Sequence, residues 1–225
     1  MRCLAALVLV SLIVLPASAQ CRPRLGFELG AALAAIDRPG QSDDRNSHMR
    51  GGPSAGLVVA FPSSRPVSFV TGLRYDRKGG RHEYDPPVTV PVVVITPKAA
   101  ASFEETEWTL DYLTVPLLAR FTIPHETASL MIEAGFEGSV LLSSSVHEES
   151  GAESSEVDGA FTDGDIGLRA GAGLMIPAFG QRILARAGFV YGLTDIRGSG
   201  GMDENANQIA SLYNRAVILT LGMSF

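Results

Sequence analysis

The chain has 225 residues and a formal net charge of −6, a length that suits one domain. The acidic balance argues against a nucleic-acid-binding surface. The hydrophobic content of 46% argues against disorder, and the 24 glycines argue against a helical bundle because glycine weakens helix interiors.

The first residues have the pattern of a secretory signal. Arg2 is followed by the apolar run 4–15 and by the small-x-small triplet 17–19. Signal peptidase recognises this order, and the run is too short to span a bilayer as a helix. We therefore expect 1–19 to be a cleaved signal peptide and 20–225 to form one domain.

Cysteine usage gives no sign of a disulfide framework. Cys3 leaves with the signal, so Cys21 has no partner. Lipoproteins begin their mature chain at such a cysteine, but Gln20 stands where lipidation requires a small residue. We expect Cys21 to be unmodified.

After the signal, apolar residues recur at every second position in eight segments, which is the signature of β-strands. The segments are 25–33, 54–61, 67–76, 113–121, 130–143, 165–176, 182–194 and 216–225. Short connections at 62–66, 123–127 and 177–181 alternate with long polar ones at 37–50, 79–105, 147–163 and 197–212. Outer-membrane barrels are connected in this way, with tight periplasmic turns and longer outer loops.

The alternate faces differ in a way that indicates which side meets lipid. One face is mostly Leu, Val, Ala and Ile, with aromatic residues near the segment ends, as in the girdles of membrane barrels. The other face holds glycine and balanced charges, which suit the narrow lumen of an eight-stranded barrel because arginine and carboxylate satisfy one another. The predicted interior residues are Glu28, Arg74, Asp76, Arg120, Glu133, Glu137, Asp165, Arg169, Arg182 and Arg186.

These features predict an all-β fold, an eight-stranded antiparallel up-and-down transmembrane β-barrel in the bacterial outer membrane. An open sheet would leave unpaired backbone groups in hydrocarbon, so the strands must close on themselves. Outer-membrane lipids are then the first expected partner, with the apolar faces turned toward them.

Several motifs in the second half resemble a known family. The stretch 110–121, LDYLTVPLLARF, is similar to a strand of the porin-family outer-membrane β-barrels of the PorT-like type, as are YGLTDI at 191–196 and Asn214-Arg215. The resemblance implies an eight-stranded outer-membrane barrel. Its C-terminal aromatic implies insertion by the barrel-assembly machinery, with Tyr213 and Phe225 as the signal. It does not imply one activity.

The outer connections hold three features with more than one interpretation. Ser145 and His147, with Glu149 on the same parity, have the residue types of a rim hydrolase, although ordinary rim residues are the simpler interpretation. The acids of 148–165 do not follow EF-hand spacing, so a solvated acidic loop is favoured over a Ca²⁺ site. The apolar stretch 88–95 is expected to extend a hairpin by pairing with 106–110, or to be a sticky patch for a partner.

No catalytic, cofactor or metal site is expected from these patterns. The leading hypothesis is a non-enzymatic barrel with a structural, adhesive or secretion-accessory role, whose loops meet an unidentified surface partner. A small-solute channel is the main alternative. A rim hydrolase and a soluble lipocalin-like binder, whose apolar face would point inward around a ligand, are the others.

Overall fold

The structure, a computed structural model, describes residues 22–37, 47–63, 66–84, 104–148, 155–156, 161–178, 180–198 and 211–225. Its strands are β1 (Arg24–Asp37), β2 (Ser47–Phe61), β3 (Val67–Tyr84), β4 (Glu104–Ile123), β5 (Ser129–Glu148), β6 (Ser155–Glu156), β7 (Gly164–Ala178), β8 (Gln181–Gly192) and β9 (Tyr213–Ser224). No helix in these ranges is long and apolar enough to cross a membrane. The predicted signal peptide and Cys21 lie outside the described residues.

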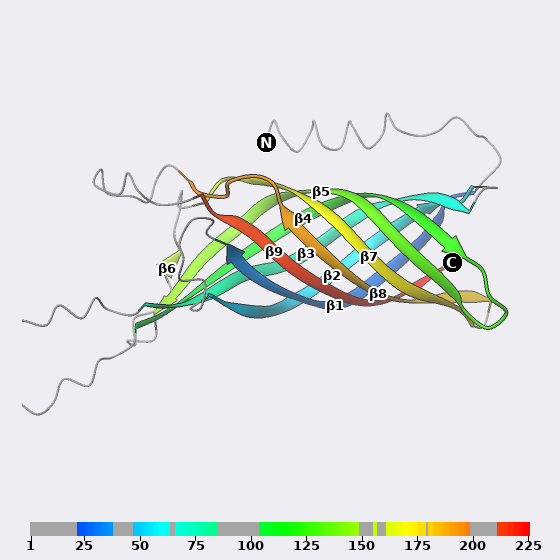
Figure 1. Cartoon of the computed structure of the whole chain (residues 1–225), viewed down its shortest axis with the longest axis horizontal. Coiled ribbons are helices and arrows are strands. Elements are labelled where there is room, and N and C mark those ends of the chain that lie inside the picture. The colour runs from blue at the N-terminus through cyan, green and yellow to red at the C-terminus, as the bar shows by residue number, and fades with distance from the viewer. Residues whose placement is uncertain are drawn as a thin grey trace, which may run out of the picture.

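The eight long strands close into one antiparallel barrel (Figure 1). Neighbours in the chain pair with one another, β1 pairs with β9, and the pairing of β4 with β5 joins the ring, while the short β6 only adds to β5. The predicted eight-stranded barrel is confirmed. Closure satisfies the backbone of these strands internally, which hydrocarbon requires.

Both ends of the described barrel lie on the side of the short connections. Gly26 near the start of β1 pairs with Ser224 at the end of β9, and the Phe225 amide donates to the Leu25 carbonyl at 2.9 Å. Tight turns face the periplasm in outer-membrane barrels, so this is the periplasmic end and the long connections are outside.

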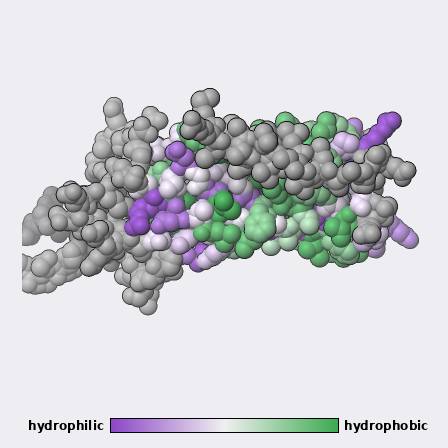
Figure 2. Space-filling model, turned by 90° about the horizontal axis from the view of Figure 1, so that it is seen from above, coloured by the Kyte–Doolittle hydropathy of each residue, from purple (hydrophilic) through white to green (hydrophobic). Residues whose placement is uncertain are grey.

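The outward positions in the lower barrel, the part nearer the periplasmic end, are apolar and exposed, as predicted. Leu221 has 66% of its surface exposed and Leu57 has 64%, which would be costly in water and is favourable in lipid. Figure 2 shows hydrophobic side chains along the middle of the visible barrel surface and hydrophilic ones toward its ends. Phe61 and Phe69 contact one another near the periplasmic end, with ring centroids 6.0 Å apart.

Strand β4 shows how long the apolar band is. From Leu113 to Phe121 its outward side chains are apolar, while the inward ones include the buried Thr114 and Arg120. A tilted strand needs about 9–11 residues to cross the hydrocarbon layer, and this stretch has that length.

Above Leu113 the same strand reverses its polarity without changing its parity. Asp111 and Glu107 now face outward, whereas Tyr112 and Leu110 face inward and are fully buried, with Trp108 partly buried beside them. In water, charged side chains on the outer face and apolar side chains in the core are favourable. In lipid, the opposite arrangement is favourable. The reversal therefore marks where the barrel leaves the bilayer.

Several strands continue further outward than the alternation indicates. The range 79–105, expected to be a loop, belongs to β3 as far as Tyr84 and to β4 from Glu104. Thr106 pairs with His82 on one side and with Glu148 on the other, so the expected pairing of 106–110 with 88–95 is wrong. The stretch 88–95 itself lies outside the described residues.

A β-bulge corrects one inward assignment on β5. Tyr112 of β4 pairs with Leu141, but Asp111 pairs with Ser143, so Leu142 is the extra residue. An extra residue shifts every later side chain to the opposite face. Ser143 is therefore exposed rather than in the lumen, and Ser144 is buried instead.

Candidate functional site

The lumen contains most of the charged residues that the alternation places there. Nine of the ten are buried: Glu28, Arg74, Asp76, Arg120, Glu133, Glu137, Asp165, Arg169 and Arg186. The tenth, Arg182, is half-buried at the periplasmic mouth, where its Nη1 lies 3.7 Å from the Met175 sulfur. Of the residues of the implied insertion signal, Tyr213 is the first residue of β9 and lies on its outward face, and Phe225 directly follows the strand and is 59% exposed.

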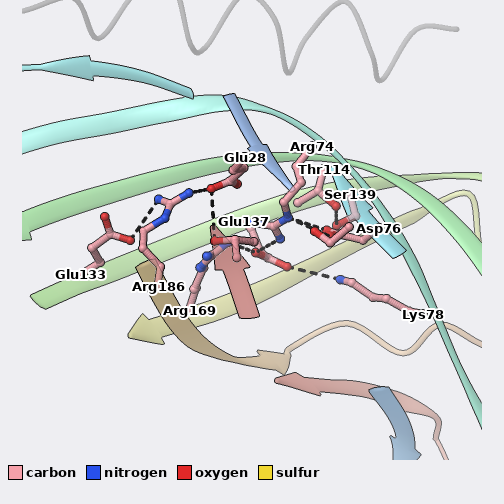
Figure 3. A network of polar contacts seen from close by, with 12 residues as sticks. Glu28, Arg74, Asp76, Lys78, Thr114, Glu133, Glu137, Ser139, Arg169 and Arg186 are labelled. Atoms are coloured by element: carbon pink, nitrogen blue, oxygen red, sulfur yellow. Dashed lines mark hydrogen bonds and ion pairs between the residues drawn. The ribbon is translucent and has the colours of Figure 1, made fainter. Parts of the chain in front are cut away.

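Glu137 of β5 is the centre of the largest cluster (Figure 3). Its carboxylate accepts a hydrogen bond from Arg74 Nη2 at 2.9 Å and lies 3.3 Å from Lys78 Nζ and 3.6 Å from Arg169 Nη1. Asp76 binds Arg74 Nε at 2.8 Å. Three strands, β3, β5 and β7, are thus tied together across the lumen by charge-assisted bonds.

A second cluster lies nearer the periplasm. Arg120 of β4 donates through Nε to Glu133 of β5 at 2.6 Å. Arg186 of β8 pairs with Glu28 of β1 and reaches the same Glu133 at 3.4 Å. The cluster has equal numbers of positive and negative groups, so each buried charge has a partner, as burial in a narrow lumen requires.

The predicted set of interior residues named charged side chains alone and left out the neutral members of the lumen. Asp165 accepts hydrogen bonds from Asn214 Nδ2 and Thr194 Oγ1, both at 2.8 Å, and Asn214 also donates to the Tyr112 hydroxyl at 3.3 Å. Further buried neutral partners are Ser54, Thr114, Ser139 and Thr220. A hydroxyl or amide on an inward position carries no sequence signal that separates it from a surface residue.

Lys78 was also missed, because its position was assigned close to the start of a loop. It is 1% exposed and lies between Glu137 and the ring of Tyr112, whose centroid is 5.3 Å from Nζ. Such a cation–π contact is favourable for a desolvated ammonium group. The continuation of β3 beyond Asp76 explains its inward placement.

Glycines on the inward face make room for the large charged side chains. A Cβ on Gly188 would lie 3.2 Å from Arg169 Nε, so the guanidinium packs against the bare backbone of β8. The predicted association of glycine with charge in this lumen therefore has a direct steric cause.

An apolar cap covers the outer end of the ionic lumen. Its members are Leu110, Tyr112, Phe161, Ile196 and Leu212, with Ile36, Trp108 and Leu141 packed against them. The rings of Trp108 and Phe161 meet edge to face, with centroids 5.1 Å apart. Backbone bonds of 2.9 Å, from Thr162 N to the Ile196 carbonyl and from Ile196 N to the Leu212 carbonyl, join the connections that carry these residues.

Asp195 joins two of the connections that carry the cap residues. Its Oδ1 accepts the amides of Leu212 and Arg197, each at 3.0 Å. Burial acts to raise the pKa of Asp195, but these hydrogen bonds outweigh burial and keep the pKa below its ordinary value.

Above the apolar band the outer face carries ion pairs. Arg77 Nε lies 2.8 Å from Asp111, and Arg50 and Arg81 both reach Glu107, at 2.6 and 3.6 Å. These pairs cross between β2, β3 and β4. They are partly exposed, so they contribute little stability individually but fix the outer surface as polar.

Of the residues considered for a rim hydrolase, Ser145 and His147 lie in the described part of β5. Ser145 pairs with Thr109, His147 pairs with Glu107, and no hydrogen bond joins Ser145 to His147 in the described part of β5. Glu149 lies outside the described residues. Within the described ranges there is also no group of three or more His, Cys, Asp and Glu able to hold a metal ion.

Comparison with solved structures finds small outer-membrane proteins. Neisserial surface protein A is 13% identical, with 89% of this chain and 95% of that chain covered and a TM-score of 0.43. Ail of Yersinia pestis is 14% identical (91% and 99% covered, TM-score 0.42), and OprG of Pseudomonas aeruginosa is 9% identical (91% and 97% covered, TM-score 0.44). No curated protein sequence matches significantly.

A family match covers most of the sequence. Residues 18–198 match the family described as outer membrane protein beta-barrel domain. Together with the closed barrel, this match places the protein in the bacterial outer membrane and excludes the soluble lipocalin-like alternative, whose apolar face would point inward. The chain belongs to the outer membrane protein β-barrel domain family.

Proposed function

We propose that this barrel is a non-enzymatic surface protein that holds a projecting β-sheet outside the membrane for contact with a macromolecular partner. The observation that carries the proposal is the unequal length of the wall. β3, β4 and β5 have 18, 20 and 20 residues, whereas β8 and β9 have 12 each.

The extra length lies on the outer side of the apolar band. From Asp111 to the start of β4 at Glu104 the strand continues for roughly 25 Å along its own direction. Figure 1 shows the outer ends of these strands extending beyond those of β1 and β9. Extended strands without a membrane to cross serve no purpose in spanning, so they point to a role in contact.

The filled lumen supports a contact role over transport. Ion pairs of 2.6–3.6 Å occupy the centre of the barrel, and the apolar cap lies above them. An eight-stranded barrel has room inside for side chains but not for an aqueous path. A small-solute channel would have to break both the ionic clusters and the cap.

Charge gives the chemistry of the partner. The connections on the outer side, 37–50, 79–107, 143–164 and 194–213, carry seventeen Asp and Glu against six Lys and Arg. A surplus of this size attracts positively charged surfaces and weakens with salt. We therefore infer a basic protein surface as the partner class.

The pairing register allows a clean test. Because His82 faces Thr106, replacing 83–105 with Asn-Gly would shorten the projecting hairpin with a two-residue turn and leave the cap and lumen in place. Cells that display the shortened protein should adhere to a surface coated with a basic protein, such as lysozyme, several-fold less than cells that display the full chain. Heat-modifiable migration on a gel would verify that both forms fold.

Planar-bilayer conductance of the refolded protein tests the alternative function, a small-solute channel. Stable openings would favour a channel, and unchanged adherence of the shortened protein would contradict a contact role. Both results would be independent of the barrel fold itself.

The finer family type and the route of assembly belong to the same proposal. The stretch 110–121 forms the part of β4 where polarity reverses, and its similarity to PorT-like barrels supports a secretion-accessory variant of the contact role. Phe225 directly follows the apolar outward face of β9 and is 59% exposed, which supports recognition by the barrel-assembly machinery, with Tyr213 facing outward at the other end of the strand.

A further inference from the structure

The periplasmic mouth of the barrel contains a small cavity rich in arginine. Its volume is about 250 Å³, and Arg24, Arg120 and Arg182 line it together with the hydroxyl residues Ser68, Thr122 and Ser224. No carboxylate belongs to its lining among the residues that the structure describes. Pockets for drug-sized ligands are larger, so this cavity suits a small group.

Of the three guanidinium groups, only that of Arg120 forms an ion pair with a carboxylate among the described residues. Arg120 uses Nε for Glu133, but its Nη2 is buried with no hydrogen-bond acceptor, in a side chain with 6% of its surface exposed. Arg182 contacts only the Met175 sulfur, and Arg24 has no ion pair within the described part of the chain.

This arrangement is unfavourable unless an acceptor enters the cavity. A buried N–H without a partner costs the desolvation energy of the group, and the positive charges of Arg24 and Arg182, which line one cavity without a carboxylate, repel each other. The guanidinium fork donates in pairs to oxyanions such as carboxylate and phosphate, and the tetrahedral phosphate group can accept from several arginines at once.

We propose that the cavity binds a phosphate group at the periplasmic face of the membrane. Arg24 and Arg182 donate from the rim of the mouth, Arg120 adds its positive charge from the buried side, and the hydroxyls of Ser68 and Thr122 complete the shell. The group comes either from free phosphate or from the headgroup of an inner-leaflet phospholipid, since the two share this chemistry.

The distribution of charge along the chain favours anions at this end alone. The three short connections, 62–66, 123–127 and 177–181, contain a single acid, Glu126, whereas the outer connections carry the acidic surplus described above. An anion is therefore repelled from the outer face and attracted to the periplasmic mouth.

The test uses the full chain refolded in an uncharged maltoside detergent and titrated with inorganic phosphate by calorimetry. The wild type should bind saturably, and the double variant Arg24→Gln/Arg182→Gln should bind about tenfold more weakly or not at all. Arg120 is left unchanged because its loss would also break the pair with Glu133.

A matched control removes the same charge away from the cavity. Arg77→Gln/Arg81→Gln changes two partly exposed arginines of the outer face and should retain the affinity of the wild type. No saturable binding by the wild type, or an equal loss in both double variants, would overturn the proposal.

The source of the phosphate is resolved in nanodiscs. If a phospholipid headgroup occupies the cavity, discs of phosphatidylglycerol should weaken binding of inorganic phosphate relative to discs of a phosphate-free glycolipid. Equal affinity in the two kinds of disc would identify free phosphate as the occupant.

Discussion

The lower and upper halves of β4 have opposite polarity on the same continuous backbone. Between Leu113 and Phe121 the strand turns apolar side chains outward and Arg120 inward, whereas above it turns Asp111 outward and Leu110 inward. The pairing register of β4 with β3 is continuous across this point. What changes is the solvent, so the reversal of polarity measures where lipid ends.

The two halves are therefore held together by different forces. The lower barrel has an ionic interior, in which Glu137 and Glu133 each join several strands. The upper part has an apolar core around Ile196 that resembles the inside of a soluble protein. Substitutions in one half should therefore leave the stability of the other half unchanged.

The largest effect is expected from Glu137→Gln. The substitution leaves Arg74, Lys78 and Arg169 around a neutral amide, and breaking a buried ion pair by removing one partner costs about 3–5 kcal/mol. Urea unfolding of the protein in lipid vesicles would measure the loss.

Glu126→Gln is the matched control, since it removes the same charge from an exposed periplasmic turn. Its free energy of unfolding should stay within about 0.5 kcal/mol of the wild type. Equal stability of the Glu137 variant would mean that the ionic lumen does not stabilise the lower barrel.

The next effect is expected in the cap. Ile196→Ala removes a fully buried side chain, for which large-to-small substitutions cost about 2–5 kcal/mol. Trp108 is the only tryptophan of the chain and packs in the cap, so its emission should shift to the red at lower denaturant concentration. Heat-modifiable migration, which reports the barrel, should not change.

Leu193→Ala is the matched control, since it shortens an exposed side chain on the same connection as Ile196. Leu193 is 44% exposed and three residues from Ile196, so its loss should leave the emission of Trp108 unchanged. If Ile196→Ala lowered barrel stability and Trp108 stability together, the two halves would form one cooperative unit.

A charge placed on the outer face should cost more in the band than above it. Ala134→Arg puts a cation at mid-height on the lipid side of β5, where the penalty is about 2–4 kcal/mol. Ser145→Arg puts the same cation on the same side of β5 beyond the bulge, where the change should be within about 0.5 kcal/mol. Similar costs at both positions would show that the band extends higher than the reversal indicates.

The same reversal explains which parts of the fold were predictable. Period-two alternation identified all eight strands because each has an apolar outward face over the width of the membrane. Beyond that width Arg77 and Arg81 replace leucine on the outward positions of β3, so the pattern resembled a polar loop and the strand ends were placed too early. Alternation defines a strand only while its surroundings stay the same.

The interior was predictable for charges and not for neutral groups. Arg74 and Glu137 stand out on an alternating face because an ion there needs a partner, whereas Asn214 and Ser54 have no such requirement. Ser143 was misplaced because a one-residue bulge leaves no trace in the sequence around Leu142. The cap was beyond sequence reasoning, since Phe161, Ile196 and Leu212 come from connections that are distant in the sequence.

The smallest expected effect is a pH dependence of the cap alone. Because hydrogen bonds from Leu212 and Arg197 hold the pKa of Asp195 below its ordinary 3.8, the charged carboxylate stabilises the cap above that pH. The contribution is lost as the pH falls through the lowered pKa, where the carboxylate takes up a proton. Trp108 emission should therefore show a shift as the pH falls below 3.8 that precedes any change in the barrel.

Asp195→Asn keeps an oxygen acceptor for the two amides but cannot titrate in this range. The shift in Trp108 emission should disappear in this variant, while the emission at pH 7 stays close to that of the wild type. A shift that persists in the variant would assign the acid sensitivity to another carboxylate of the outer part, with Asp111 as the next candidate because its bonds to Arg77 also lower its pKa against the effect of burial. The contrast between the halves would then rest on the ion pairs of the outer face rather than on the connections beneath it.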